Sequence, residues 1–247
     1  MFEIPKQYYL VSQILSFWPF RVHLETMQHF SHFSEENYLK TLYKLEDKQI
    51  KKVNNIALSK ALDLNPATVL EMVRKMSERK LVEVLPDKTI RLTEKGKKKA
   101  LSIIRKHRLW EVFLVDKLKY KWNEVHDLAE QLEHIESDDL IKRLEAFLGH
   151  PSVDPHGDPI PDENGKLKKI KTQPLTTAPL KKKLTIIALG NSSDEFLKYL
   201  DKIGLTIGDT VEVTEVEDFD KSVTLLHKKS PISLSNDAAS SLLVNIA

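Results

Sequence analysis

Two His and six acidic residues fall within fourteen positions of this chain, in the stretch HDLAEQLEHIESDD at 126–139. An α-helix advances about 100° per residue, so positions i, i+4, i+7 and i+8 share one face. Those positions are His126, Glu130, Glu133 and His134, and each side chain can ligate a metal ion. An acidic helix taken alone is more often a solvated surface, so the surrounding sequence must decide.

A second His–Glu pair lies upstream, where His107 and Glu111 are four residues apart in RKHRLWE. Both would project from one helical face, and two antiparallel helices could bring this face against the first. Alone, His107 is more often a solvated or hydrogen-bonded imidazole. Together the two patterns favour a binuclear cation site. The chain has no Cys, which excludes disulfides and zinc–thiolate sites and leaves N and O ligands.

Charge is distributed unevenly along the 247 residues, although the net charge is only +2. Residues 51–106 carry fifteen Lys/Arg against six Asp/Glu, and residues 107–147 carry six against ten. A basic block followed by an acidic one indicates a surface for a polyanion and a surface that attracts cations. The length allows one large domain or two small ones.

The first 33 residues stand apart as an atypical extension. Residues 8–20, YYLVSQILSFWPF, are apolar, but only Lys6 precedes them and they are shorter than the roughly 20 residues of a membrane span. We therefore expect no membrane or secretory role. One hypothesis is that translation starts at Met27, which would make residues 1–26 upstream sequence.

Three helices and a hairpin are predicted next. The helices are 34–47, with Ser34 as N-cap, 54–64 and 67–80, and the hairpin is 81–93 around Pro86. This order is typical of a winged helix-turn-helix, whose third helix enters the DNA major groove. A small packing module without a ligand is the alternative, and the basic excess favours DNA.

The third of these helices supplies the candidate DNA contacts. Val69, Val73 and Met76 should face the core. Thr68 and Glu71 are candidates for base edges, and Lys75 is a candidate for phosphate. The complete predicted DNA-binding set is Pro66, Ala67, Thr68, Glu71 and Lys75.

The remaining sequence predicts helices and then strands. A long helix at 93–118 precedes the acidic helix, and another helix follows at 138–148. Residues 149–179 hold six of the eleven Pro and three of the seven Gly, which indicates an ordered proline-rich arm or a linker. Beyond it, LTIIALG, DTVEVTEVE and KSVTLLHK alternate like strands around a helix at 193–204, as in a compact β domain.

These motifs resemble one family, the diphtheria-toxin-repressor and manganese-transport-regulator (DtxR/MntR) family. RKHRLWEVFL, EVHDLAEQLEHIESDDLIKRLEAFLGHP and DPHGDPIP are similar to its metal-binding and dimerisation region. NPATVLEMVRKMSERKLVEV is similar to its recognition helix and wing, and SEENYLKTLY to its first helix. The C-terminal part looks like its SH3-like, FeoA-type domain. The resemblance covers about residues 34–247.

The resemblance implies a mainly α fold with a small β part. The expected domains are an N-terminal extension, a winged helix-turn-helix domain, a helical metal-binding and dimerisation domain, a proline-rich arm and an SH3-like domain, at 1–33, 34–98, 99–150, 151–179 and 180–247. It also implies a cytoplasmic homodimer that binds a near-palindromic operator in double-stranded DNA.

The resemblance further implies two metal sites. Glu130, Glu133 and His134 would form the primary site together with Asn37 of the first helix. The ancillary site would consist of residues from the helical domain and one from the SH3-like domain, where Glu195 is the nearest match: His107, Glu111, His126 and Glu195.

Two departures from the family pattern bear on the metal. Asn37 and Lys40 stand where some manganese-sensing members have carboxylates, so the coordination number at the primary site is open. Glu130 stands where iron-sensing members can have a sulfur ligand. Oxygen donors with imidazole suit Mn²⁺, so we expect Mn²⁺ with Fe²⁺ as the alternative, although Zn²⁺ or Cu²⁺ would bind tighter if available. Affinity should fall below about pH 6, because ligating His must be neutral.

The sequence therefore predicts a manganese-dependent transcriptional repressor of metal-uptake genes, in which metal ties the DNA-binding unit to the dimer core. An iron-dependent repressor of the same architecture and a metal-independent winged-helix protein remain alternatives. A di-metal enzyme would need paired Glu-x-x-His motifs, and no His in this chain has Glu three residues before it. We therefore do not expect an enzyme.

Overall fold

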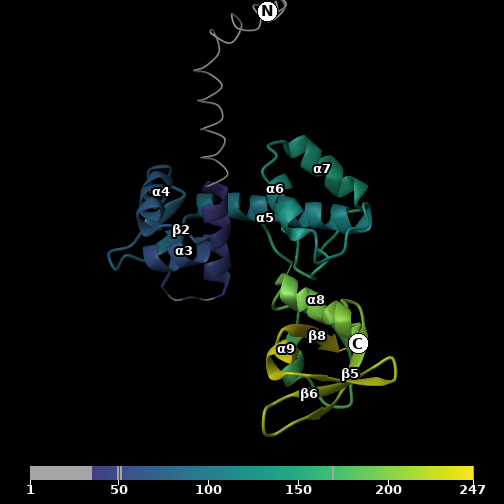
Figure 1. Cartoon of the computed structure of the whole chain (residues 1–247). Helices are drawn as coiled ribbons and strands as arrows, with labels where there is room; N and C mark the ends of the chain where they lie inside the picture. The colour runs from purple at the N-terminus through teal and green to yellow at the C-terminus, as the bar shows by residue number, and fades with distance from the viewer. Residues whose placement is uncertain (1–34, 49, 51, 169, 247) are drawn as a thin grey trace, which may run out of the picture. The chain divides into compact units, whose positions relative to one another are not determined.

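The computed structural model describes residues 35–48, 50, 52–168 and 170–246 (Figure 1). Our expectations for the apolar stretch 8–20, for a start at Met27 and for Ser34 as a helix cap lie outside these residues. The chain divides into two compact units, residues 1–100 and 101–247, and helix α5 (Glu94–Asp116) contributes to both. Within the described part, no helix combines the length and apolarity needed to cross a membrane.

The N-terminal unit is the predicted winged helix-turn-helix. Residues 35–47 are helical and are followed by α3 (Asn55–Leu62), α4 (Pro66–Glu78) and the antiparallel pair β1 (Val82–Val84) and β2 (Ile90–Leu92). Helices α3 and α4 both begin at an Asn cap: Asn54 accepts from the N–H of Ala57, and Asn65 from that of Ala67. Pro66 follows Asn65 at the first helical position, where its missing N–H costs nothing.

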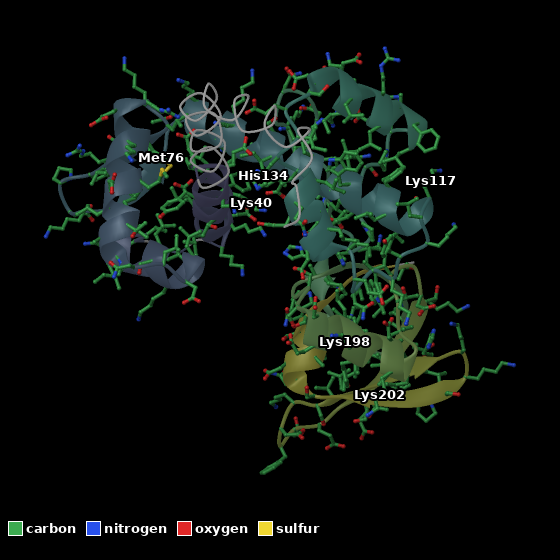
Figure 2. The ribbon with its side chains drawn as sticks, turned by 45° about the horizontal axis from the view of Figure 1, so that its top comes forward. Lys40, Met76, Lys117, His134, Lys198 and Lys202 are labelled. Atoms are coloured by element: carbon green, nitrogen blue, oxygen red, sulfur yellow. The ribbon has the colours of Figure 1, made fainter. Side chains whose placement is uncertain are left out.

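An apolar core holds the described part of this unit together. Val69, Val73 and Met76 of α4 are buried, as the sequence predicted, and Met76 is labelled in Figure 2. They pack with residues of the first helix, of α3 and of the wing. Gly96 of α5 completes the packing, because a Cβ there would lie 1.9 Å from the carbonyl oxygen of Leu81. The backbone of α5 therefore approaches the wing closely.

The helical part of the second unit departs from the sequence prediction at the acidic helix. Helix α6 (His126–Leu132) ends with Glu133 as its C-cap, and His134 lies in the turn that follows. Ser137 then caps α7 (Asp138–Phe147) by accepting from the N–H of Leu140. The prediction that His134 shares one helical face with His126 is therefore wrong, because the new cap starts a second helix after a short turn.

The C-terminal part of the second unit is a six-stranded antiparallel sheet in the order β3-β8-β4-β5-β6-β7. The three predicted strands are β4 (Lys183–Leu189), β5 (Thr210–Val216) and β6 (Val223–His227), and the predicted helix is α8 (Asp194–Ile203). The elements that the sequence prediction missed are β3 (Gln173–Pro174), the short helix η3 (Leu175–Thr177), β7 (Ser230–Leu234), α9 (Asn236–Ser240) and β8 (Leu242–Ile246). Its core includes Leu184, Ile186, Val213 and Leu225.

The proline-rich segment is an ordered arm over residues 151–162, held by two arginines of α5. Arg105 donates to both carboxylate oxygens of Glu145, at 2.9 and 2.6 Å, and to the carbonyl of Pro161 at 2.9 Å. Arg108 donates to the carbonyl of Pro159 at 2.5 Å. Planar guanidinium groups suit such multiple contacts. The arm is therefore fixed against the same helix that carries His107 and Glu111.

Gly157 joins this arm to the sheet, and its replacement by alanine should destabilise the second unit by about 1–3 kcal/mol through overpacking. Its φ is +83°, and a Cβ there would lie 2.2 Å from the carbonyl oxygen of Ile187. Gly149→Ala is a matched control, because Gly149 has φ +77° with nothing within 4 Å of the added Cβ. Urea unfolding followed by Trp fluorescence measures both variants, and equal losses would contradict the packing argument.

Candidate metal centre

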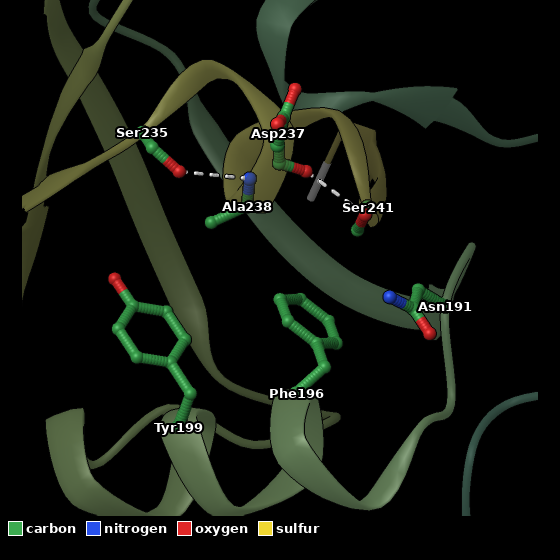
Figure 3. A pocket seen from close by; sticks show the side chains of 7 residues that line it. All are labelled: Asn191, Phe196, Tyr199, Ser235, Asp237, Ala238 and Ser241. Carbon is green, nitrogen blue, oxygen red and sulfur yellow. Dashed lines mark hydrogen bonds between the residues drawn. The ribbon is translucent and has the colours of Figure 1, made fainter.

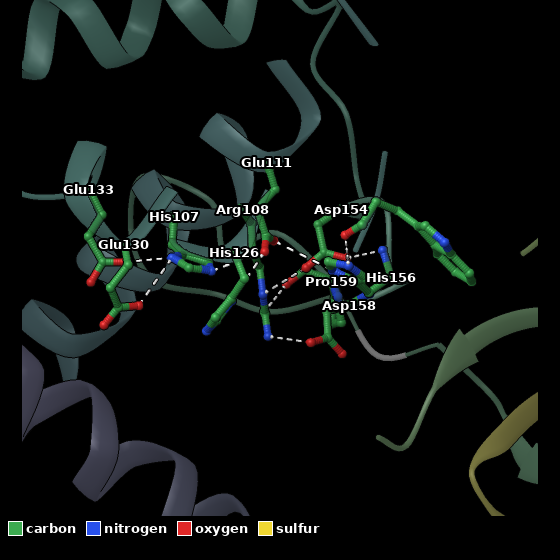
Figure 4. A network of polar contacts seen from close by, with 11 residues as sticks. His107, Arg108, Glu111, His126, Glu130, Glu133, Asp154, His156, Asp158 and Pro159 are labelled. Atoms are coloured by element: carbon green, nitrogen blue, oxygen red, sulfur yellow. Dashed lines mark hydrogen bonds and ion pairs between the residues drawn. The ribbon is translucent and has the colours of Figure 1, made fainter. Parts of the chain in front are cut away.

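His107 lies between two carboxylates in the second unit (Figure 4). Its Nε2 is 3.1 Å from Oε1 of Glu111, one helical turn further along α5, and its Nδ1 is 2.5 Å from Oε2 of Glu133. All three side chains are buried. Carboxylates only accept hydrogen bonds, so without a cation both ring nitrogens of His107 carry protons.

The buried charges shift one another's titration. Burial alone would lower the pKa of His107, but hydrogen bonds with Glu111 and Glu133 outweigh it and raise that pKa. Burial alone would raise the pKa of Glu111, but hydrogen bonds with neighbouring imidazoles hold it well below its usual range. Glu111 is therefore a carboxylate at neutral pH, and protons on His107 compete with any cation.

Three groups of side chains place one ligand atom each within 4.8 Å of one another. Each group mixes imidazole nitrogen with carboxylate oxygen, a donor set that suits divalent cations such as Mn²⁺, Fe²⁺ and Zn²⁺. The groups are His107, Glu111 and His126; His107, Glu130 and Glu133; and Glu111, Asp154 and His156. Two of them share Glu111 and two share His107.

The first two groups contain five of the residues predicted as ligands. His126 is exposed at the start of α6, with Nδ1 at 3.6 Å from Oε1 of Glu111. Glu130 lies one turn further along α6, with Oε2 at 3.8 Å from Nδ1 of His107. The predicted ancillary residues on α5 and α6 thus lie together, and Glu130 and Glu133 lie beside them.

The third group contains two residues that the sequence analysis did not assign. His156 donates from Nε2 to the backbone carbonyl of Trp122 at 2.9 Å, and its Nδ1 is 3.8 Å from Oε2 of Glu111. Asp154 accepts at Oδ1 from the backbone N–H groups of His156 and Asp158. The available signal was the DPHGDPIP motif, in which Asp154 directly precedes Pro155 and His156 lies between Pro155 and Gly157, residues that are typical of a defined turn.

Asp154 is a buried carboxyl group of the centre whose pKa is raised. Burial is the main cause that raises its pKa, to about 7, and the negative charges of Glu111 and Asp158 add to the effect. The guanidinium of Arg108 opposes it, with Nε at 3.4 Å from Oδ2 of Asp154. A buried carboxyl group held near neutrality is one that a nearby cation would ionise.

The other predicted ligands lie outside the three groups. His134 is buried, with Nε2 at 3.9 Å from Oε1 of Glu133. Glu195 is exposed in the first turn of α8. Asn37 belongs to the N-terminal unit, and its buried Oδ1 accepts no hydrogen bond among the described residues.

A pocket of about 460 Å³ opens between α8 and α9 in the C-terminal part (Figure 3). Phe196 and Tyr199 line one side, and Asp237 is its only carboxylate. The lining contains no His, so this pocket does not repeat the donor set of the metal centre. Glu195 does not line it either, although its neighbour Phe196 does.

The predicted DNA-binding residues lie together at the start of α4. Pro66, Ala67 and Thr68 form its exposed first turn. Glu71 and Lys75 follow along the exposed face, and Lys75 Nζ is 2.8 Å from Glu71 Oε1. This arrangement presents methyl, hydroxyl, carboxylate and ammonium groups, which are the groups that contact base edges and phosphates in a major groove.

A winged helix-turn-helix unit followed by a helical unit with clustered His and carboxylate ligands defines a metal-dependent DNA-binding regulator. Three family models match the chain: "Iron dependent repressor, N-terminal DNA binding domain" over residues 32–90, "Iron dependent repressor, metal binding and dimerisation domain" over 93–162, and "FeoA domain" over 173–246. The chain belongs to the DtxR/MntR family of metal-dependent transcriptional repressors, which are not enzymes.

This chain is similar to known repressors, some of which are named for iron and some for manganese. It is 30% identical to the diphtheria toxin repressor of Corynebacterium diphtheriae over 220 residues, 85% of this chain and 95% of that protein. It is 39% identical to the iron-dependent repressor IdeR of Mycobacterium tuberculosis over 126 residues. This match covers 51% of this chain and 54% of IdeR, which is about half of each protein. A solved manganese-dependent transcriptional repressor in complex with manganese superimposes with a TM-score of 0.76 at 31% identity, covering 86% of this chain and 100% of that one.

Proposed function

We propose that this protein is a Mn²⁺-dependent repressor of metal-uptake genes, with Fe²⁺ as the alternative signal. The observation that carries the proposal is the buried arrangement of His107, Glu111 and Glu133, in which one imidazole lies between two carboxylates. Burying these charged groups lowers the stability of the fold unless other charges compensate them, which favours a functional role for the arrangement. A divalent cation would compensate the carboxylates while the imidazole lost a proton.

Donor chemistry supports Mn²⁺ over Fe²⁺. All groups that could ligate a cation in the described residues offer oxygen and imidazole nitrogen, and the chain has no Cys. Such donors suit Mn²⁺, whereas a thiolate or thioether would favour later ions. The names of the relatives include both iron-dependent and manganese-dependent repressors, so the proposal of Mn²⁺ depends on this chain's own ligands.

Ligand roles follow from the geometry and the family pattern together. We assign Glu130, Glu133 and His134 to the primary site, and for Asn37 we keep the ligand role that the resemblance to the family implies. His107, Glu111 and His126 form the ancillary site. Asp154 and His156 take the place that the sequence analysis gave to Glu195, because they lie beside Glu111 in the buried centre.

The same unit would provide the dimer interface. Its helical part leaves several large apolar side chains exposed, which is typical of an interaction surface. They include Leu118, Leu140 and Phe147, at 53, 37 and 63% exposure. A homodimer would present two copies of α4 to half-sites about one helical turn of DNA apart, or a multiple of it, on a near-palindromic operator. Because the DNA would be chromosomal, we place the protein in the cytoplasm.

Metal addition should tighten DNA binding by roughly 5- to 150-fold, the effect of a coupling of about 1–3 kcal/mol. Fluorescence anisotropy with DNA from upstream of the protein's own gene measures this, first with EDTA and then anaerobically with Mn²⁺ or Fe²⁺. Each metal is added at the same multiple of its own dissociation constant from the protein. If Mn²⁺ then tightens DNA binding more than Fe²⁺ does, the result supports Mn²⁺ as the signal. Binding that ignores chelator would instead favour a metal-independent winged-helix protein.

Replacing Lys75 by alanine should weaken binding to all DNA sequences alike and reduce the salt slope of log K by about 1. Lys75 is exposed on α4, where its ammonium group would contact phosphate rather than a base. Lys202→Ala serves as the control, because Lys202 is an exposed lysine on α8 (Figure 2). Anisotropy titrations at several salt concentrations measure the slopes. A loss confined to one operator sequence would show that Lys75 reads a base.

A further inference from the structure

A second basic surface lies in the C-terminal part of the chain. Residues 164–193 contain seven Lys and no Asp or Glu, and these lysines are Lys166, Lys168, Lys169, Lys171, Lys181, Lys182 and Lys183. We infer that the last four contact DNA phosphates that flank the half-sites bound by α4. This inference rests on the proposed function and adds to it, because it concerns the same complex with DNA.

The sheet brings these four lysines to one of its ends. Strands β3 and β4 lie on either side of β8 and both pair antiparallel with it, so they run in the same direction. Lys171 precedes β3 by two residues, and Lys181 and Lys182 lead into Lys183, the first residue of β4. Both strands start beside the end of β8. Strands separated by one other strand are about 10 Å apart, which long lysine side chains can span.

The ammonium groups of these lysines are not neutralised by neighbouring carboxylates. All four residues, named here the β3–β4 lysine cluster, are exposed: Lys171, Lys181, Lys182 and Lys183. Within the described residues none of them forms an ion pair, although Lys183 lies opposite Glu212 in the register of β4 and β5. By contrast, Lys221 and Lys228 of the same part pair with aspartates at 3.5 and 3.4 Å. The cluster therefore keeps its positive charge for a polyanion.

DNA is the polyanion that the chemistry of the cluster favours. Lysine is a flexible point charge that binds phosphate without reading bases, so the contact would not depend on sequence. A DNA-bound N-terminal unit holds the C-terminal part of the same chain at a high effective concentration near that DNA, which makes weak contacts count.

An anionic membrane surface is the competing partner, because Ile170 and Leu180 beside the cluster are 37 and 51% exposed. Single exposed apolar side chains are common on soluble proteins, and membrane-surface binding usually uses an amphipathic helix. Residues 170 and 180 both lie outside helices. The observations therefore favour DNA over lipid.

The salt dependence of DNA binding tests the inference. Full-length protein with Mn²⁺ is titrated by fluorescence anisotropy with DNA from upstream of its own gene, either with its flanks or trimmed to the half-sites. Each phosphate contact contributes about 0.9 to the slope of log K against log salt concentration. We expect the cluster variant to lose about 3 to 4 from this slope per chain on flanked DNA and nothing on trimmed DNA. The variant combines Lys171→Gln, Lys181→Gln, Lys182→Gln and Lys183→Gln.

A control variant removes the same charge elsewhere on the second unit. It replaces four exposed lysines by Gln, two of them on α8 in Figure 2: Lys119, Lys198, Lys202 and Lys229. Equal loss of slope in both variants overturns the inference, because net charge rather than this surface would then act. An unchanged slope in the cluster variant also overturns it. If that variant instead loses binding to phosphatidylglycerol–phosphatidylcholine vesicles that the wild type binds, the partner is an anionic membrane.

The response to Mn²⁺ separates this inference from the proposed function. The cluster variant should keep the wild-type ratio of DNA affinities with Mn²⁺ and with EDTA. If wild-type binding ignores Mn²⁺ while the cluster variant still loses slope, the Mn²⁺-dependent mechanism fails and the inference stands. Near-UV circular dichroism checks folding. The double variant Lys171→Gln with Lys182→Gln, both outside strands, decides the question if the cluster variant does not fold, with an expected loss of about 2 in slope.

Discussion

Glu133→Ala is expected to abolish the effect of Mn²⁺ on DNA binding. Glu133 is fully buried, and its two oxygens face different imidazoles, Oε2 at 2.5 Å from His107 and Oε1 at 3.9 Å from His134. It is thus a proposed ligand of the primary site and also the group that orients His107. Loss of an orienting group alone typically costs 10- to 100-fold in metal affinity, and loss of a ligand adds to this.

Anisotropy titrations with and without Mn²⁺ measure the effect of this substitution. Asp127→Ala is the matched control, because Asp127 is an exposed acidic residue on the same helix and belongs to none of the ligand groups. Glu133→Gln keeps the shape of the side chain and guards against loss of folding, which near-UV circular dichroism would detect. A Glu133→Ala protein that responds to Mn²⁺ like the wild type would show that the centre does not regulate DNA binding.

Lowering the pH from 8 to 6 should weaken Mn²⁺ binding by about 100-fold for each proton that the cation displaces, since each proton contributes a factor of ten per pH unit. Burial opposes the shifts, but the neighbouring carboxylates raise the pKa of His107 and bring that of His156 to about 9. Both imidazoles must lose a proton to ligate. Because these pKa values are raised, Mn²⁺ affinity should begin to fall at a higher pH than the value of about 6 that is expected for ordinary imidazoles.

The stability of the cation-free protein should change with pH in the opposite direction to its Mn²⁺ affinity. A raised folded-state pKa stabilises the fold fully below the unfolded pKa of His, about 6.5, and this contribution is lost as the pH rises through the raised value. Without Mn²⁺ we therefore expect stability to fall above neutral pH, and Mn²⁺ should restore it. Calorimetric titration and thermal unfolding between pH 6 and 8 measure both effects. Affinity that is independent of pH would exclude these imidazoles as ligands.

Much of the N-terminal unit could be predicted from sequence, because its signals are local. Asn and Pro at helix starts, apolar residues at helical spacing and a short turn between alternating runs define its elements. Pro66 and Met76 illustrate this, as the first begins α4 and the second is buried as predicted. Strand β7 was missed because it contains Pro231 and shows little apolar alternation, so that its pairing with β6 sets its structure.

The centre itself was only partly predictable. The pairs His107–Glu111 and His126–Glu130 follow from helical periodicity, and the structure does bring His107, Glu111 and His126 together. His156 lies in a segment without periodicity, and only the tertiary contacts of the arm place it beside Glu111. Periodicity also fails where a helix ends, which is why it placed His134 on a face that stops at Glu133.

Trp122 gives the centre an optical reporter. Its ring is stacked on that of His156, with centroids 6.1 Å apart and an interplanar angle of 19°, and its indole N–H donates to Asp201 on α8 at 2.8 Å. An imidazolium over an indole is a cation–π contact, which exchange of the proton for a metal ion would alter. The fluorescence of one native side chain is therefore positioned to follow cation loading without any label.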